Sequence, residues 1–161
     1  MKNKAIRYIS LFLLIFVMGV IFYFSAQPAD VSDETSGGVV QKLLSIIYPH
    51  FNNFDRLAQE DIIITLILPV RALAHFSEFS LLGAVLFLFL STFSGVLYNR
   101  RSLFTFLFGL IYAVSDELHQ LFVPGRACQI SDVAVDIFGV FTAIILCLML
   151  SRIWRRKRDE Q

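Results

Sequence analysis

The chain has 161 residues, of which 57% are hydrophobic and 17% are charged, and its formal net charge is +1. Soluble domains are less apolar and more charged, so this composition excludes a soluble globular protein and predicts an integral membrane protein. Because there is no internal repeat, low-complexity tract or long linker, one membrane domain is expected over residues 1–161.

Four apolar stretches are each long enough to cross a hydrocarbon core as a helix of about 20 residues. They cover residues 6–24, 70–97, 102–121 and 133–153. The third qualifies only if the polar residues of the sequence SDELHQ form its last turns. The expected fold is therefore an all-α bundle of four transmembrane helices.

The distribution of basic residues predicts the orientation of these helices. Ten Lys and Arg residues lie before or at the start of the first stretch, between the second and the third, or at the end of the fourth and after it, against four elsewhere. Cytoplasmic loops are enriched in Lys and Arg, so both termini are expected in the cytoplasm. The first stretch is expected to stay as a membrane helix, because its apolar run is longer than that of a signal peptide. In addition, Phe24 stands where cleavage would need a small residue.

The outer segment, residues 25–69, is too apolar to be disordered and is expected to fold onto the membrane surface as short amphipathic helices. In its first part, Val39, Leu43 and Ile46 recur at helical spacing before a proline. A second stretch, DRLAQEDIIITLILP, becomes apolar before Pro69 and predicts a separate, shallowly embedded helix. Such helices either cover the outer ends of the bundle or form a lid over a site.

Polar side chains gather near the outer ends of the four stretches. Arg71, His75 and Glu78 are spaced i, i+4 and i+7, so they share one helix face. Ser25 and Gln27 end the first stretch at the same level. The polar residues of the two later stretches are Asp116, Glu117, His119, Gln120, Asp132 and Asp136. Apart from Arg7 and Arg152 at the ends of their stretches, the inner halves carry no charged residue, which argues against a carrier or channel for a polar solute.

The loop VPGRACQIS joins the last two stretches. It places Arg126 beside a predicted turn at Pro124 and Gly125. Either Ser131 or Asp132 is expected to cap the last helix.

Two structural explanations compete with a functional site. A charged residue near a helix end often reaches the headgroup region without any function. A buried ion-pair network would only fasten the helices together, although intramembrane polar contacts contribute only about 1 kcal/mol each. A site explains better why cations and carboxylates share helix faces at one depth in several helices.

Three strings of the chain resemble the signature regions of the VanZ-like family of small bacterial membrane proteins. They are FYFSAQPADVSDETSG, RALAHFSEFSLLG and SDELHQLFVPGRACQISDVAVDIFG, in that order. The resemblance implies a multi-pass protein of the bacterial cytoplasmic membrane that is associated with resistance to glycopeptides such as teicoplanin. It does not imply a particular reaction. By position, the family pattern falls on Ser25, Gln27, Arg71, His75, Glu78, Asp116, Glu117, Gln120, Arg126, Asp132 and Asp136.

The chain departs from this pattern at three positions. Arg71 stands where lysine is more common, and Phe79 where tyrosine is common, and these changes broadly keep charge and shape. Asp136 stands where asparagine is common. It adds a negative charge to the cluster and is expected to change how the cluster titrates.

The set of residues suits acid/base chemistry on an amphiphile, such as an envelope lipid or a lipid-linked precursor. The expected catalytic residues are His75, Glu78, Asp116, Glu117 and Asp132. The expected substrate-binding residues are Ser25, Gln27, Arg71, Gln120, Arg126 and Asp136. Among these, the two arginines suit a phosphate or carboxylate group.

Other functions stay open at the level of the sequence. The chain could instead bind or shield a lipid or an antibiotic without catalysis, and transport is less favoured. The sequence requires no cofactor and predicts no metal. An ion, if bound, would take His75, Asp116, Glu117 and His119, whose donors suit zinc or manganese. Membrane lipids are the expected partners and nucleic acid is not, and the sequence has no signal for an oligomeric state.

Overall fold

The computed structural model describes residues 2–93, 96 and 98–159. All the regular secondary structure within these residues is helical. The helices are α1 (Lys2–Ser25), α2 (Ala29–Ile47), η1 (a 3-10 helix, Pro49–Asn53), α3 (Arg56–Ser91), α4 (Tyr98–Gln120) and α5 (Ile130–Asp159). Three segments of the described residues are long and apolar enough to cross a membrane, namely Lys4–Ser25, Arg56–Ser91 and Ile130–Lys157. The prediction of an all-helical membrane protein is confirmed.

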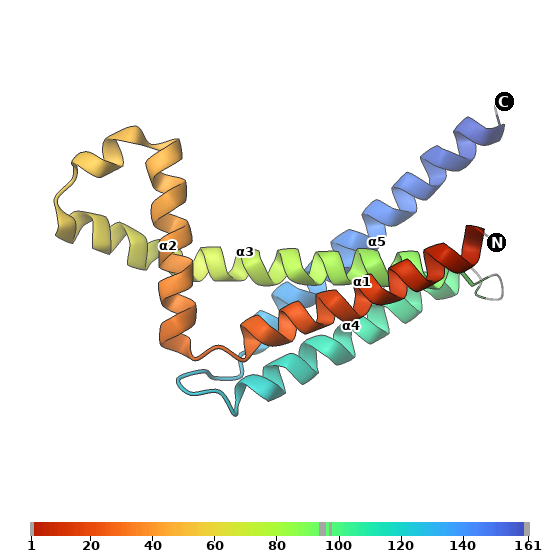
Figure 1. Ribbon diagram of the computed structural model, residues 1–161, viewed down its shortest axis with the longest axis horizontal. Helices are drawn as coiled ribbons and strands as arrows, with labels where there is room; N and C mark the ends of the chain where they lie inside the picture. Colours follow the sequence, from red (N-terminus) through yellow and green to blue (C-terminus); the bar gives the residue numbers. More distant parts are fainter. Residues whose placement is uncertain (1, 94–95, 97, 160–161) are drawn as a thin grey trace.

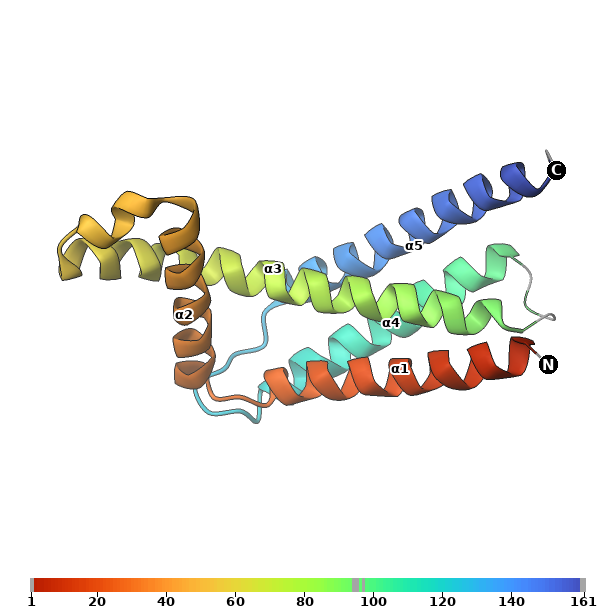
Figure 2. The ribbon, with the colours of Figure 1, turned by 45° about the horizontal axis from the view of Figure 1, so that its top comes forward.

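Four helices form an elongated bundle, in which α1, α3 and α4 run along one another and α5 crosses α3 before it diverges (Figures 1 and 2). The start of α1 and the end of α5 lie at one end of the bundle, which we call the terminal end. The connections at residues 26–28 and 121–129 lie at the opposite end, which we call the loop end. There α2 lies across the bundle, and the first turns of α3 extend beyond it (Figure 1).

The core of the bundle is formed by apolar side chains from all four long helices. Examples are Ile21 of α1, Phe79 of α3, Ala113 of α4 and Val140 of α5, all almost completely buried. Many large hydrophobic side chains remain exposed on the outer faces of the same helices. This distribution suits helices whose outer surfaces contact lipid tails rather than water.

Helices α3 and α5 approach each other closely. A Cβ atom added to Gly139 would lie 2.5 Å from the carbonyl oxygen of Phe76, so only glycine fits there. The hydroxyl of Ser80 donates a hydrogen bond of 3.1 Å to the carbonyl of Gly139. One turn away, Gly83 packs in the same way against Val140. Small residues at helix contacts let two backbones approach closely in a membrane protein.

Two predictions about the second span are wrong. Residues 56–69 do not form a separate shallow helix, because they are the first turns of α3 and Pro69 lies inside that helix. A proline within a helix removes one backbone hydrogen bond, which neighbouring helices can compensate in a membrane protein. Here α2 packs across this part of α3, with Gly37 against Ile63. The predicted span also ends too late, since α3 ends at Ser91. Residues 94, 95 and 97 of that prediction lie outside the described residues.

The start of α5 also differs from the prediction. The helix begins at Ile130, so Ser131 and Asp132 lie in its first turn and neither is the residue before it. The carbonyl of Gln129 accepts hydrogen bonds from the backbone N–H groups of Asp132 and Val133, so the helix starts at least two residues earlier than a cap at Ser131 or Asp132 would imply. The predicted turn at Gly125 is confirmed, with a φ of 74° that favours glycine.

We predict that Gly139→Ala lowers the free energy of unfolding by about 1–3 kcal/mol, the usual effect of overpacking. The reason is the clash of the new methyl group with the backbone of α3. Gly19→Ala is the matched control, because a Cβ at Gly19 meets no atom within 4 Å. Thermal unfolding of both variants in the same detergent measures the difference, and equal stability of the two would contradict the close helix contact.

Candidate functional site

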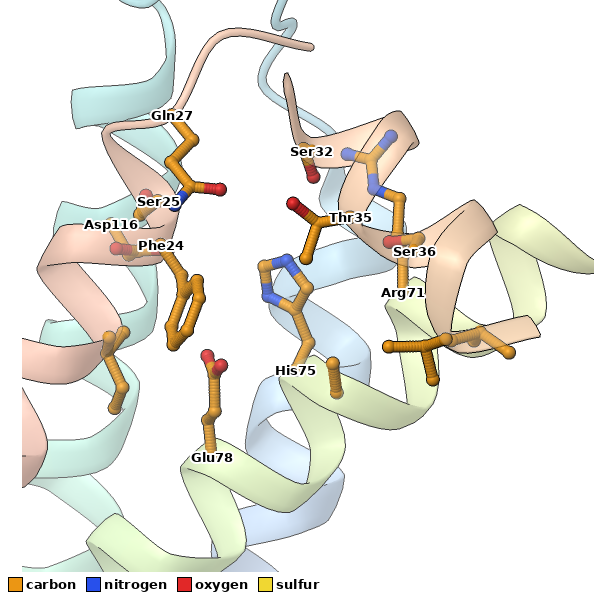
Figure 3. A pocket seen from close by; sticks show the side chains of 14 residues that line it. Phe24, Ser25, Gln27, Ser32, Thr35, Ser36, Arg71, His75, Glu78 and Asp116 are labelled. Carbon is orange, nitrogen blue, oxygen red and sulfur yellow. The ribbon is translucent and has the colours of Figure 1, made fainter. Parts of the chain in front are cut away.

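A cavity of about 240 Å³ lies at the loop end, between α1, α2, α3 and α4 (Figure 3). Helix α3 presents three polar side chains to it, because their spacing places them on one face. The cavity brings together six of the predicted site residues, which are Ser25, Gln27, Arg71, His75, Glu78 and Asp116. The helical spacing in the sequence correctly placed the three residues of α3 on one face.

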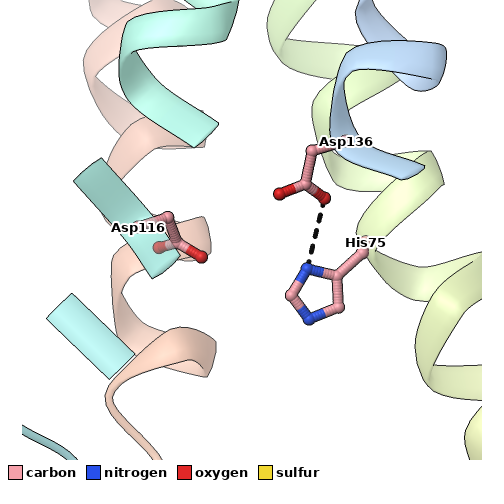
Figure 4. Close-up of side chains that lie close together, drawn as sticks. All are labelled: His75, Asp116 and Asp136. Atoms are coloured by element: carbon pink, nitrogen blue, oxygen red, sulfur yellow. Dashed lines mark ion pairs between the residues drawn. The ribbon is translucent and has the colours of Figure 1, made fainter. Parts of the chain in front are cut away.

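His75 faces a carboxylate of α5 behind the cavity. Its Nδ1 atom lies 3.3 Å from Oδ1 of Asp136, whose side chain is completely buried (Figure 4). The two atoms lie at ion-pair distance but outside hydrogen-bond geometry, and neither oxygen of Asp136 has a hydrogen-bond donor among the described residues. Among the described residues, the carboxylate nearest to the imidazole is therefore that of Asp136.

Asp116 approaches the same imidazole from α4. His75, Asp116 and Asp136 each offer one nitrogen or oxygen atom, and these three atoms lie within 4.8 Å of one another. The carboxylates of the two aspartates point toward the space beside the ring (Figure 4). Gln120, one turn further along α4, donates a hydrogen bond of 3.2 Å to Oδ2 of Asp116 and so fixes its orientation. Three helices thus converge on one buried ionisable cluster.

Glu117 and His119 point elsewhere. The Oε2 atom of Glu117 accepts a hydrogen bond of 2.8 Å from the backbone N–H of Gln129, so this carboxylate ties the last loop to α4. The ring of His119 stacks on Phe22, with 4.7 Å between the ring centroids. The four residues predicted as an alternative metal set are therefore not brought together, and His75 and Asp116 lie beside Asp136 instead.

Two arginines lie at the rim of the site. Nη1 of Arg71 forms an ion pair of 3.1 Å with Asp33 of α2. Nε of Arg126 donates a hydrogen bond of 3.2 Å to the carbonyl of Gln27, while its Nη1 is buried without a hydrogen-bond partner. Burial and, to a smaller extent, the charge of Arg71 lower the pKa of Arg126 from its ordinary value. An anion that contacts both guanidinium groups would offset the repulsion between their charges.

A second cavity of about 240 Å³ shares Arg71 and His75 with the first and is closed on the α5 side by Asp132. Asp132 also accepts a hydrogen bond of 3.2 Å from the hydroxyl of Ser131. The predicted catalytic residue Asp132 is therefore near the imidazole but not in the cavity that holds Glu78 and Asp116.

Sequence reasoning missed the part of the site that α2 supplies. Ser32, Thr35 and Ser36 line the first cavity opposite α1, and Asp33 pairs with Arg71 (Figure 3). The signal was present, since hydroxyl residues at positions i, i+3 and i+4 share a face. The sequence interpretation of this helix used its apolar residues alone, although one of them, Val39, lines the same cavity as the hydroxyl residues.

The cluster has the parts that acid/base chemistry requires. An imidazole next to a carboxylate is a common arrangement for a general base, and a second carboxylate in the same cavity can hold the proton that is moved. The guanidinium group of Arg71 lines the same cavity and supplies positive charge for an anionic ligand.

Comparison with known proteins shows the family to which the chain belongs. Residues 10–152 match the model of the family described as VanZ/LLP1. Comparisons with curated proteins and with solved structures find no match. The matched residues include the whole cavity and all four long helices in large part, and the chain belongs to the VanZ/LLP1 family.

Proposed function

We propose that the chain binds the anionic headgroup of an amphiphile in the cavity at the loop end, and that this end faces the outside of the cell. The amphiphile is an envelope lipid or a lipid-linked precursor. The observation that carries the proposal is the composition of the cavity, which joins ionisable side chains in its depth to apolar side chains at its edge.

The edge of the cavity suits an acyl or polyprenyl chain. Phe24 and Val39 line it and are 41% and 45% exposed, so the rim is both apolar and accessible. The volume is below the range of about 300–1,000 Å³ that holds a whole small molecule. A headgroup therefore fits inside while the apolar chain stays among the lipids outside.

The two arginines at the rim of the cavity suit an anion. The guanidinium group of Arg71 carries a positive charge and forms an ion pair with Asp33. The Nη1 atom of Arg126 has no hydrogen-bond partner and is a further donor for an anion. Guanidinium groups bind phosphate and carboxylate groups through paired hydrogen bonds. The hydroxyl of Ser25, buried and without a hydrogen-bond partner, is a further group that a headgroup oxygen could engage.

The proposed orientation requires α4 to be a fourth transmembrane helix. α4 has 23 residues and would extend about 34 Å, enough for a hydrocarbon core of about 30 Å. It connects the end of α3 at the terminal end to the start of α5 at the loop end, and runs alongside α1 (Figure 2). Four spans place both termini on one side, and the ten basic residues near the terminal end favour the cytoplasm.

The acid/base cluster would act on the bound headgroup, with His75, Glu78 and Asp116 closest to it. We connect this activity to resistance against glycopeptides such as teicoplanin, because the family resemblance implies that association and the cavity is proposed to hold an envelope lipid or precursor at the outer face. A protein that holds an amphiphile without catalysis is the second candidate. Val39, Leu43 and Ile46 of α2 favour it, because their exposed side chains form an apolar surface suited to the membrane interface.

The orientation predicts which native cysteine is accessible from outside. Cys128 lies exposed in the loop between α4 and α5. In a Cys147→Ser background, a membrane-impermeant maleimide should label Cys128 in intact cells. The matched control is Arg156→Cys in a background with both native cysteines replaced by serine, which should be labelled only after permeabilisation. Labelling with the opposite pattern would reverse the proposed orientation.

The proposed anion site predicts the effect of removing one guanidinium group. Arg71→Ala should weaken binding of phosphatidylglycerol to the purified protein at least about tenfold, because a hydrogen bond to a charged group contributes about 1.5–3 kcal/mol. Arg56→Ala is the matched control, since Arg56 is exposed at the far end of the same helix. Titration followed by native mass spectrometry measures both affinities. Equal weakening by the two changes, or equal binding of phosphatidylcholine, would contradict a specific anion site.

A further inference from the structure

We infer that His75, Asp116 and Asp136 bind a divalent transition-metal ion, zinc or manganese, between α3, α4 and α5. This metal set differs from the one that the sequence suggested. The inference concerns the same cavity as the proposed function, but it stands on the geometry of these three residues and its test requires no lipid.

The spacing of the donors fits one ion. A tetrahedral zinc ion with bonds of about 2.1 Å separates its ligands by about 3.4 Å. The Nδ1 atom of His75 and the Oδ1 atom of Asp136 lie 3.3 Å apart. Asp116 completes a set of three donors that all lie within 4.8 Å of one another.

The environment of Asp136 is a second observation that favours a bound cation. Its side chain is completely buried, faces the other two residues (Figure 4), and has no hydrogen-bond donor for either oxygen among the described residues. Burying a carboxylate without such compensation is strongly unfavourable. Within the described part of the chain, no lysine or arginine lies at ion-pair distance from Asp116 or Asp136. A single imidazolium would neutralise only one of the two aspartates, whereas a divalent ion neutralises both.

The surroundings also suit a metal site. Gln120 donates a hydrogen bond to Oδ2 of Asp116, as residues around a metal commonly do to orient a carboxylate ligand. His75 and Asp116 line the first cavity while Asp136 lies behind them. Three protein ligands leave a coordination position free, and it would open toward the cavity where the headgroup is proposed to bind.

The mixture of one nitrogen and two oxygen donors indicates the class of metal. Magnesium and calcium prefer oxygen ligands alone, whereas zinc and manganese accept imidazole together with carboxylates. The absence of a cysteine from the set leaves both ions possible, so the experiment titrates each of them separately.

The test measures ion binding by the purified full-length protein, prepared with an affinity tag that lacks histidine. After removal of metal with a chelator, the protein is titrated with Zn²⁺ or Mn²⁺, and bound metal is determined by elemental analysis. We expect one ion per chain and a higher unfolding temperature with the ion. Asp136→Asn and Asp116→Asn should each weaken the binding at least about tenfold, as expected for the loss of a ligand.

Two controls separate this site from adventitious binding. Asp61→Asn makes the same chemical change at an exposed position of α3 and should bind the ion like the wild type. Cys128→Ser removes an exposed thiol that could bind zinc by itself, and it should also have no effect. A wild-type protein without a stoichiometric ion would overturn the inference, even if an aspartate variant failed to fold. So would binding that is lost in Cys128→Ser or retained in both asparagine variants.

Discussion

The close contact between α3 and α5 is the constraint on which the rest of the structure depends. Because Gly139 has no side chain, the backbone of α5 lies against the carbonyl of Phe76, and Ser80 closes the contact with a hydrogen bond. One turn toward the loop end, this approach brings Asp136 to 3.3 Å from His75. A wider separation of the two helices would leave the aspartate buried without the imidazole. The ionisable cluster therefore depends on a helix contact made by small, uncharged residues.

Much of the fold could be predicted because hydrophobic length is a strong signal in membrane proteins. The first, third and fourth predicted stretches fall within α1, within one residue of α4 and within α5, respectively. The second prediction was wrong at its start because Pro69 was interpreted as a helix boundary. A local pattern cannot reveal that another helix, α2, packs across the proline and supports a continuous helix.

The sequence could predict which site residues share a face of one helix, but not which residues of different helices meet. Helical spacing correctly placed Arg71, His75 and Glu78 on one face, since that depends on local geometry alone. The approach of Asp136 to His75 and the contribution of α2 to the cavity depend on which helices pack together, and no local pattern encodes this. Glu117 shows that the sequence pattern can also suggest a catalytic role for a residue with a structural contact. Its carboxylate accepts a hydrogen bond from the backbone of Gln129 and so holds the loop between α4 and α5.

In the proposed function, the buried cluster at the loop end acts on an envelope amphiphile. This can be tested by comparing lipids and cell-wall precursors in a deletion strain complemented with the wild type or with Asp116→Asn. We expect Asp116→Asn, produced at the wild-type level, to leave the same altered profile as the deletion, because an amide keeps the shape of the side chain but not its charge. A wild-type profile in that strain would contradict chemistry at the cluster.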